Sequence, residues 1–89
     1  MVKGTTRGGF KFSIDPKNVK DMRVVELAAK ATREPLYMPE LASRILGESQ
    51  KEALYKHLED SKGRVDPERF GEELEDIMGA IDKDEETKN

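Results

Sequence analysis

The stretch from residue 41 to residue 81 constrains the fold most, because three apolar patterns with helical spacing follow one another in it. The first two patterns meet at the LGESQ segment of residues 46–50, and the third begins after the GRVDP segment of residues 63–67. Gly47 can adopt the left-handed conformation that often ends a helix, and Asp66 followed by Pro67 is typical of a helix start. The sequence therefore predicts a helix–helix–turn–helix unit.

The clearest amphipathic pattern lies in the last of these predicted helices. Its apolar residues follow spacings of four, three, one and three, and they are Phe70, Leu74, Ile77, Met78 and Ile81. Gly71 and Gly79 lie in the same helix on roughly one face, and each costs about 0.5–1 kcal/mol relative to alanine. They are either a tolerated weakness or points of close packing, within the domain or with a partner.

One further helix and a hydrophobic loop are predicted upstream. Asp21 is an N-cap candidate, and the apolar spacing after it predicts a helix over about residues 21–32. Pro35 and Pro39 bracket residues 36–38, and proline disfavours helix in the residue before it, so this segment is predicted to be a loop. Pro39 then suits the first turn of the next helix.

The start of the chain carries no helical pattern. Residues 1–9 contain three glycines and no hydrophobic periodicity, which predicts a flexible basic arm. Phe10, Phe12 and Ile14 then alternate with polar residues, which indicates a short strand or an extended segment lying over the helices. A lone strand has no partner here, so we favour the extended segment.

The end of the chain is polar throughout. Residues 82–89 contain no apolar residue, which predicts a flexible acidic tail. The expected organisation is thus an arm over 1–9, a helical domain over 10–81 and a tail over 82–89. The predicted fold class is all-α, a small bundle of about four helices with a short extended N-terminal segment.

Composition narrows the functional classes. The chain has 89 residues, of which 35% are hydrophobic and 39% charged, and it contains no cysteine. A chain of this size buries only about 60–65% of its unfolded surface, so stabilising partners are expected. No apolar run approaches the roughly 20 residues of a spanning helix, and the first residues lack the apolar segment of a signal peptide. We therefore expect no membrane contact, and the absence of cysteine suits the cytosol.

Charge is distributed unevenly along the chain, whose net charge is −3. The first twelve residues carry Lys3, Arg7 and Lys11 without an acid, whereas residues 66–76 hold six acids against Arg69 alone. Such a split can align subunits head to tail, hold one end of the chain against the body, or give a solubilising arm.

The residues needed for catalysis or metal binding are sparse. His57 is the only histidine and lies in a predicted amphipathic helix, with no sequence sign of an activated nucleophile beside it. A zinc site needs several Cys or His ligands. The alternation of Asp82, Asp84 and Glu86 lacks the central glycine and closing glutamate of a calcium loop. We expect no enzymatic activity, no cofactor and no metal.

A helix-turn-helix DNA-binding repressor is an alternative suggested by residues 41–51. The turn glycine of that motif usually follows the helix alanine by four positions, whereas Gly47 follows Ala42 by five. The second helix would also bring more acids than bases to the phosphates. We therefore expect no nucleic acid as partner.

Candidate partner contacts lie outside the regular helices. Phe10, Phe12, Leu36, Tyr37 and Met38 belong to irregular segments that a small core need not cover. Packing of these residues onto the helices is the competing interpretation. Gly71 and Gly79 complete the set of candidates as close-packing points.

A family resemblance is carried by LGESQ at residues 46–50 with Leu54 and Leu58, then by GRVD at residues 63–66 and a helix that contains Ile77. The FKFSID segment at residues 10–15 and the helix after Asp21 belong to the same pattern. With these segments the chain resembles the tail assembly chaperones of long-tailed, siphovirus-type bacteriophages over about residues 10–81. One departure is Met22, where many members have an aromatic residue.

The resemblance implies a non-enzymatic protein of viral morphogenesis, made in the cytoplasm of an infected or lysogenic bacterium and absent from the mature virion. Such chaperones coat the helical tape measure protein and help to recruit subunits of the major tail (tube) protein. Self-association stays open. The alternative functions are a small helical adaptor or regulator that binds another protein, and the DNA-binding repressor.

Overall fold

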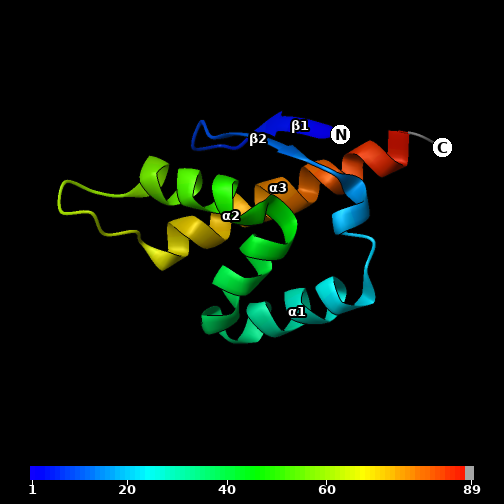
Figure 1. The fold of residues 1–89 in the computed structure, drawn as a ribbon, viewed down its shortest axis with the longest axis horizontal. Helices are drawn as coiled ribbons and strands as arrows, with labels where there is room; N and C mark the ends of the chain where they lie inside the picture. The colour runs from blue at the N-terminus through cyan, green and yellow to red at the C-terminus, as the bar shows by residue number, and fades with distance from the viewer. Residues whose placement is uncertain (88–89) are drawn as a thin grey trace.

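The computed structural model describes the backbone of residues 1–87 and the side chains of residues 1–82. Within this part of the chain, two strands and three helices follow one another as β1 (Val2–Thr5), β2 (Lys11–Ile14), α1 (Met22–Arg33), α2 (Met38–Leu58) and α3 (Pro67–Thr87). Short 3-10 helices at Pro16–Asn18 and Pro35–Tyr37 precede α1 and α2. Figure 1 shows the strand pair on one side of α2 and α3, with α1 on the other side.

The predicted all-α bundle of about four helices is wrong. The described chain holds three helices, and β1 pairs with β2 as an antiparallel sheet, in register from Val2 opposite Ile14 to Thr5 opposite Lys11. The residues predicted to form a flexible arm therefore supply the missing strand partner. Val2 is the only large apolar residue of β1, so the strand shows no alternation in the sequence.

The turn between the strands explains two of the glycines near the start. Thr6 N donates to Phe10 O at 2.9 Å, and Gly9 N donates to Thr6 O at 2.9 Å. Gly9 has a φ of 89°, a conformation that glycine adopts without the steric cost of a Cβ. The close approach of Gly8 to α3 is described with the candidate site below. A glycine-rich segment thus marks a tight hairpin turn.

The predicted first helix is confirmed as α1. Asp21 Oδ1 accepts a hydrogen bond from Arg23 N at 2.9 Å, which is the N-cap that the sequence indicates. The helix ends at Arg33, two residues before Pro35. Val24 and Leu27 are buried, and they fix α1 against the body.

The two helices predicted on either side of Gly47 form one element, α2, with a kink between them. Gly47 has φ 82° and ψ 163°, which is not helical, so the break is real although α2 continues past it. The side chain of Gln50 joins this point to the sheet. Its Nε2 donates to Leu46 O at 2.9 Å and to Ser13 O at 2.8 Å, and its Oε1 accepts from Ser13 N at 2.9 Å.

The last predicted helix is confirmed at its start and is longer than expected at its end. Asp66 caps α3, because its Oδ1 accepts from Glu68 N at 3.1 Å and its carbonyl accepts from Phe70 N at 3.0 Å. The helix runs to Thr87, so residues 82–87 are helical rather than a tail. Charged residues such as glutamate propagate a packed helix well. Residues 88–89 lie outside the described part.

The core joins all five elements. It consists of Val2, Phe10, Phe12, Ile14, Val24, Leu27, Leu41, Ala42, Ile45, Leu46, Leu54, Leu58, Phe70, Leu74, Ile77 and Ile81. Over residues 1–87, none of the helices is both long enough and apolar enough to cross a membrane.

Candidate functional site

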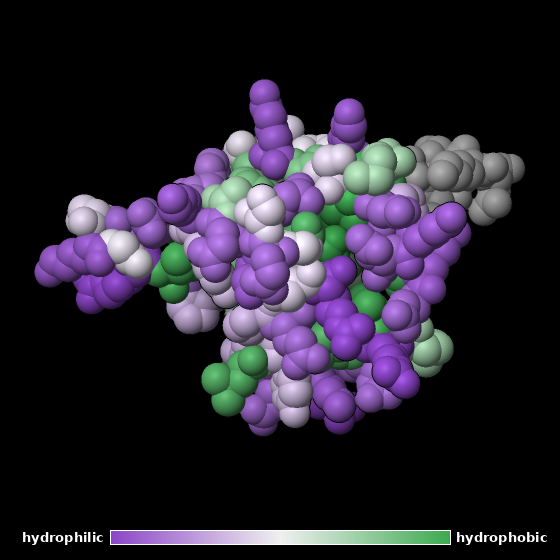
Figure 2. Space-filling view, viewed as in Figure 1, coloured by the Kyte–Doolittle hydropathy of each residue, from purple (hydrophilic) through white to green (hydrophobic). Residues whose placement is uncertain are grey.

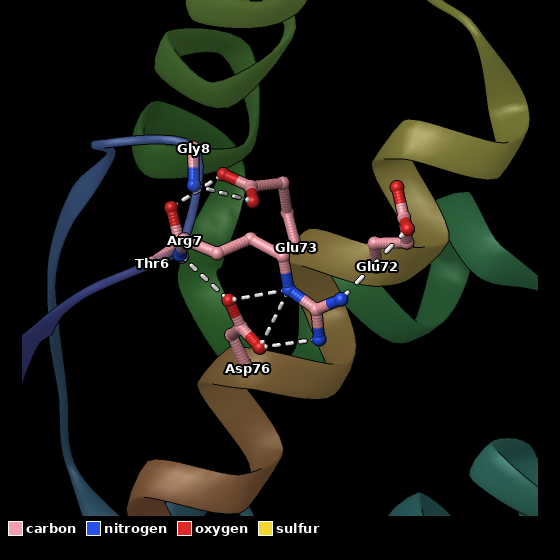
Figure 3. Close-up of polar contacts among 6 residues, drawn as sticks. All are labelled: Thr6, Arg7, Gly8, Glu72, Glu73 and Asp76. Atoms are coloured by element: carbon pink, nitrogen blue, oxygen red, sulfur yellow. Dashed lines mark hydrogen bonds and ion pairs between the residues drawn. The ribbon is translucent and has the colours of Figure 1, made fainter.

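The hairpin turn is attached to α3 by a cluster of polar contacts, shown in Figure 3, which we call the hairpin clasp and define as Thr6, Arg7, Gly8, Glu73 and Asp76. Arg7 contacts Asp76 through both its side chain and its backbone N–H. The guanidinium Nη2 lies 2.7 Å from Oδ1, and the backbone N of Arg7 donates to Oδ2 at 2.7 Å. Of the outcomes that the charge split allows, the structure shows one, a basic end held against the acidic helix of the same chain.

The two charged groups of this pair shift each other's pKa in opposite directions. The pKa of Asp76 is lowered, first by the hydrogen bond from the Arg7 side chain and then by the one from its backbone. The pKa of Arg7 is raised in return, and Glu72, whose Oε2 lies 3.8 Å from Nη1, adds a smaller contribution. Both groups are therefore held in their charged forms.

The buried half of the clasp is a carboxylate paired with a hydroxyl. Glu73 is only 3% exposed; its Oε1 accepts a hydrogen bond from Thr6 Oγ1, and its Oε2 accepts one from Gly8 N at 3.2 Å. A Cβ on residue 8 would lie 2.8 Å from Glu73 Oε1, so only glycine fits there without displacing the carboxylate. A buried acid with two donors is a satisfied structural group.

His57 belongs to the same region and has a structural role. Its Nε2 donates to Gly8 O at 2.8 Å, and its ring lies 5.7 Å from the ring of Phe10. The described residues include no group of three acidic, histidine or cysteine side chains able to hold a metal ion. The polar cluster is therefore best explained as the attachment of the sheet to the helices.

Two of the predicted partner contacts are core residues. Phe10 is 7% exposed and Phe12 is 5% exposed, so neither side chain offers a docking surface. Pairing of β1 with β2 turns both rings into the molecule, where a Cβ on Gly4 would lie 2.8 Å from the Phe12 ring. The prediction of these residues as surface contacts is wrong, because it assumed an extended segment without a sheet partner.

The other three aromatic and aliphatic candidates lie at the junction of α1 and α2. Leu36 is 86% exposed and Tyr37 is 37% exposed, while Met38 is partly buried against the core. Lys30 Nζ lies 5.6 Å from the centre of the Tyr37 ring. Figure 2 shows a hydrophobic protrusion at the lower left, over this junction, on an otherwise largely hydrophilic face.

The two glycines of α3 differ in their surroundings. A Cβ on Gly71 would lie 3.4 Å from Met38 Sδ, so this position is a close contact between α3 and the start of α2. A Cβ on Gly79 would meet nothing within 4 Å. Gly71 is thus a packing point within the domain, whereas Gly79 faces open space.

That open space belongs to a groove between α1, the start of α2 and α3, with a volume of about 620 Å³. Buried and half-buried apolar residues form its base, and exposed acids of α3 stand at its edge. The lining residues are Ala28, Ala31, Thr32, Met38, Leu41, Glu68, Gly71, Glu72, Leu74, Glu75, Met78, Gly79 and Asp82. We call this set the α1–α3 groove.

A second, smaller pocket adjoins the groove at Met38. It has a volume of about 280 Å³ and is lined by Pro35, Leu36, Met38, Pro39, Tyr55, Val65, Pro67 and Phe70. Nearly all of its lining is apolar, and the rings of Tyr55 and Phe70 lie 5.2 Å apart within it. Groove and pocket together surround the start of α2 with unfilled apolar surface.

Four of the residues predicted as partner contacts lie on this surface. Leu36, Met38, Gly71 and Gly79 all line the groove or the pocket. The contribution of α1 was missed, although Ala28 and Ala31 are small residues three positions apart, a spacing that places them on one helix face. The sequence shows the acids at the edge only as an excess over residues 66–76 and as part of the polar end of the chain, without placing them beside apolar residues.

Comparison of the chain with known protein families, with curated proteins and with solved structures gave no match.

Proposed function

We propose that this protein is a non-enzymatic tail assembly chaperone of a long-tailed bacteriophage, which binds the helical tape measure protein and helps to recruit tail tube subunits. The proposal combines the family resemblance of residues 10–81 with one structural observation. That observation is the open α1–α3 groove, whose base includes the apolar residues Leu41, Leu74 and Met78.

A groove of this kind suits a chaperone for helices. An amphipathic helix binds by laying its apolar face into a hydrophobic groove, and the small residues Ala28, Ala31 and Gly79 allow its backbone to come near. A small body that covers only a few turns must bind repeatedly along a long partner. Many weak contacts of this type then keep the partner soluble through multivalency.

The charge of the chain supports the same role. A net charge of −3 and an acidic α3 keep a coated complex in solution through mutual repulsion of the bound copies. The hairpin clasp directs the shortest contacts of Arg7 to Asp76, so among the acids that line the groove only Glu72, at 3.8 Å, lies within ion-pair distance of that cation over the described residues.

The genomic test of the proposal is the neighbouring coding sequence. A tail chaperone predicts a slippery heptanucleotide with an overlapping frame near the stop codon, followed by a very long helical reading frame. An unrelated operon at this place contradicts the phage assignment and favours the alternative, a helical adaptor that uses the same groove on another protein.

The biochemical test is co-expression with the tape measure protein of the same phage. The expected result is that the tape measure protein moves from the pellet to the soluble fraction and co-purifies with this chain. Gly79→Leu fills the groove, so it should abolish that effect, whereas Ala53→Leu on the exposed part of α2 should not. An insoluble tape measure protein in the presence of the wild-type chain overturns the proposal.

A further inference from the structure

Most of the exposed acids of the α1–α3 groove have no ion-pair partner among the side chains of residues 1–82. Among the described residues, no lysine or arginine lies within ion-pair distance of Glu68, Glu75 or Asp82, and Glu72 has only the 3.8 Å contact with Arg7. The groove lining itself includes four acids and no base over the described residues. Over the described residues the edge of the groove therefore carries an excess of negative charge, which the contact of Arg7 with Glu72 offsets only in part.

In the free protein the acids at the edge of the groove repel one another. Glu68 and Glu72 are four residues apart and Glu72 and Glu75 three apart, and like charges at these helical spacings destabilise a helix. Cations brought from outside would relieve that repulsion. Those cations would then lie directly beside the apolar base of the groove.

The spacing of the acids also indicates how long a complementary helix in the groove must be. Glu68 and Asp82 are separated along α3 by about 21 Å, at roughly 1.5 Å per helical residue. A facing helix that matches this row needs about four turns. Its apolar stripe would lie over Leu74 and Met78, and a large side chain could enter the space beside Gly79.

We propose that the α1–α3 groove selects a basic amphipathic helix, with lysine or arginine flanking an apolar stripe of about four turns. This inference rests on the proposed function and specifies which segments of a long helical partner the chain binds. Apolar contact supplies most of the affinity, and the acidic edge supplies the choice among otherwise similar helices.

The test uses the full-length chain and two synthetic helical peptides with the same leucine stripe. One peptide carries lysines beside the stripe and the other carries glutamates at the same positions. Titration by fluorescence anisotropy should show binding of the lysine peptide and at least tenfold weaker binding of the glutamate peptide. Equal binding of both peptides, or binding of neither, overturns the inference.

Paired charge reversals locate the binding to the groove. The double variant Glu68→Lys with Glu75→Lys should weaken binding of the lysine peptide by about three- to tenfold, since two exposed ion pairs are lost and the reversed charges also repel the peptide. The control is Glu52→Lys with Glu59→Lys, which makes the same charge change at exposed positions in α2 and directly after it, outside the lining. Equal weakening by both double variants would show a general charge effect and contradict the inference.

The same variants separate this inference from the proposed function. One outcome is that the double variant Glu68→Lys with Glu75→Lys keeps the tape measure protein soluble when Gly79→Leu does not. The groove then binds its partner without selecting its charge, and only the inference fails. If the wild-type chain binds the lysine peptide but has no effect on the tape measure protein, the proposed function fails and the groove specificity stands.

Discussion

Arg7, on the hairpin turn, presents both its guanidinium and its backbone N–H to the single carboxylate of Asp76 on α3. The two contacts cross 69 residues of sequence, and they lie at the exposed side of the clasp whose buried side is the Thr6–Glu73 pair. One carboxylate thereby fixes both the position and the direction of the turn. This arrangement makes the attachment of the sheet sensitive to acid.

Acidification should loosen the sheet. The pKa of Asp76 is lower in the folded protein than in the unfolded chain, where it is about 3.9, so this contribution to stability is complete above that value and is lost as pH falls through the folded pKa. Thermal unfolding between pH 7 and pH 2.5 should show a decline in Tm below about pH 4. Asp76→Asn should lower Tm at pH 7 and reduce the further decline; an unchanged acid profile in this variant would contradict the assignment.

Thr6→Val should destabilise the protein by about 1–3 kcal/mol, because it removes the donor to Glu73 and the Oγ1 acceptor of Phe10 N at 3.0 Å while keeping the side-chain shape. Urea unfolding followed by circular dichroism measures the change. Thr6→Ser keeps the hydroxyl and should retain most of the stability. A valine variant as stable as wild type would show that the buried carboxylate does not need this hydroxyl.

Alanine substitutions at two glycines should have opposite effects on stability. Gly79→Ala places a Cβ in open space inside α3 and should stabilise by about 0.5–1 kcal/mol. Gly47→Ala forces a Cβ into a backbone conformation with φ 82° and ψ 163° and should destabilise by about 1–3 kcal/mol. Guanidinium unfolding compares the two variants. Stabilisation by Gly47→Ala would mean that the kink in α2 is not required.

Leu36→Asp should leave unfolding unchanged within about 0.5 kcal/mol, because this side chain is mostly in solvent. Phe12→Ala should cost about 3–5 kcal/mol, since it opens a cavity in the core. If the junction of α1 and α2 belongs to the partner surface, Leu36→Asp and Tyr37→Asp also weaken tape measure binding while helicity stays intact. An equal loss of helicity would show that these residues are structural.

Local signals explain which elements the sequence predicts well. Asp21 and Asp66 cap their own helices through residues two positions away, so α1 and the start of α3 follow from short segments. The kink at Gly47 is local in the same sense. Beyond the kink, Gln50 joins α2 to the sheet through its hydrogen bonds with Ser13, and no short segment reveals that contact.

The sheet and the groove depend on distant contacts instead. β1 has one large apolar residue, and its position is set by the clasp, whose partners are more than 60 residues away. Phe10 and Phe12 have the same chemical character as Leu36, and only the hairpin decides that the first two are inside. The groove lies between α1, the start of α2 and α3, and so could not be located from any one helix alone.

The clasp has a consequence for the order of events during synthesis. Thr6 and Arg7 leave the ribosome early, but Glu73 and Asp76 are made about seventy residues later, and closing so large a loop costs entropy that only the finished contacts repay. Until α3 has emerged, β1 lacks the helix against which it packs, although β2 can already contact α2. β1 is made before the helices and is nevertheless expected to be among the last of these elements to dock, and a nascent chain that stops before residue 73 cannot complete the domain.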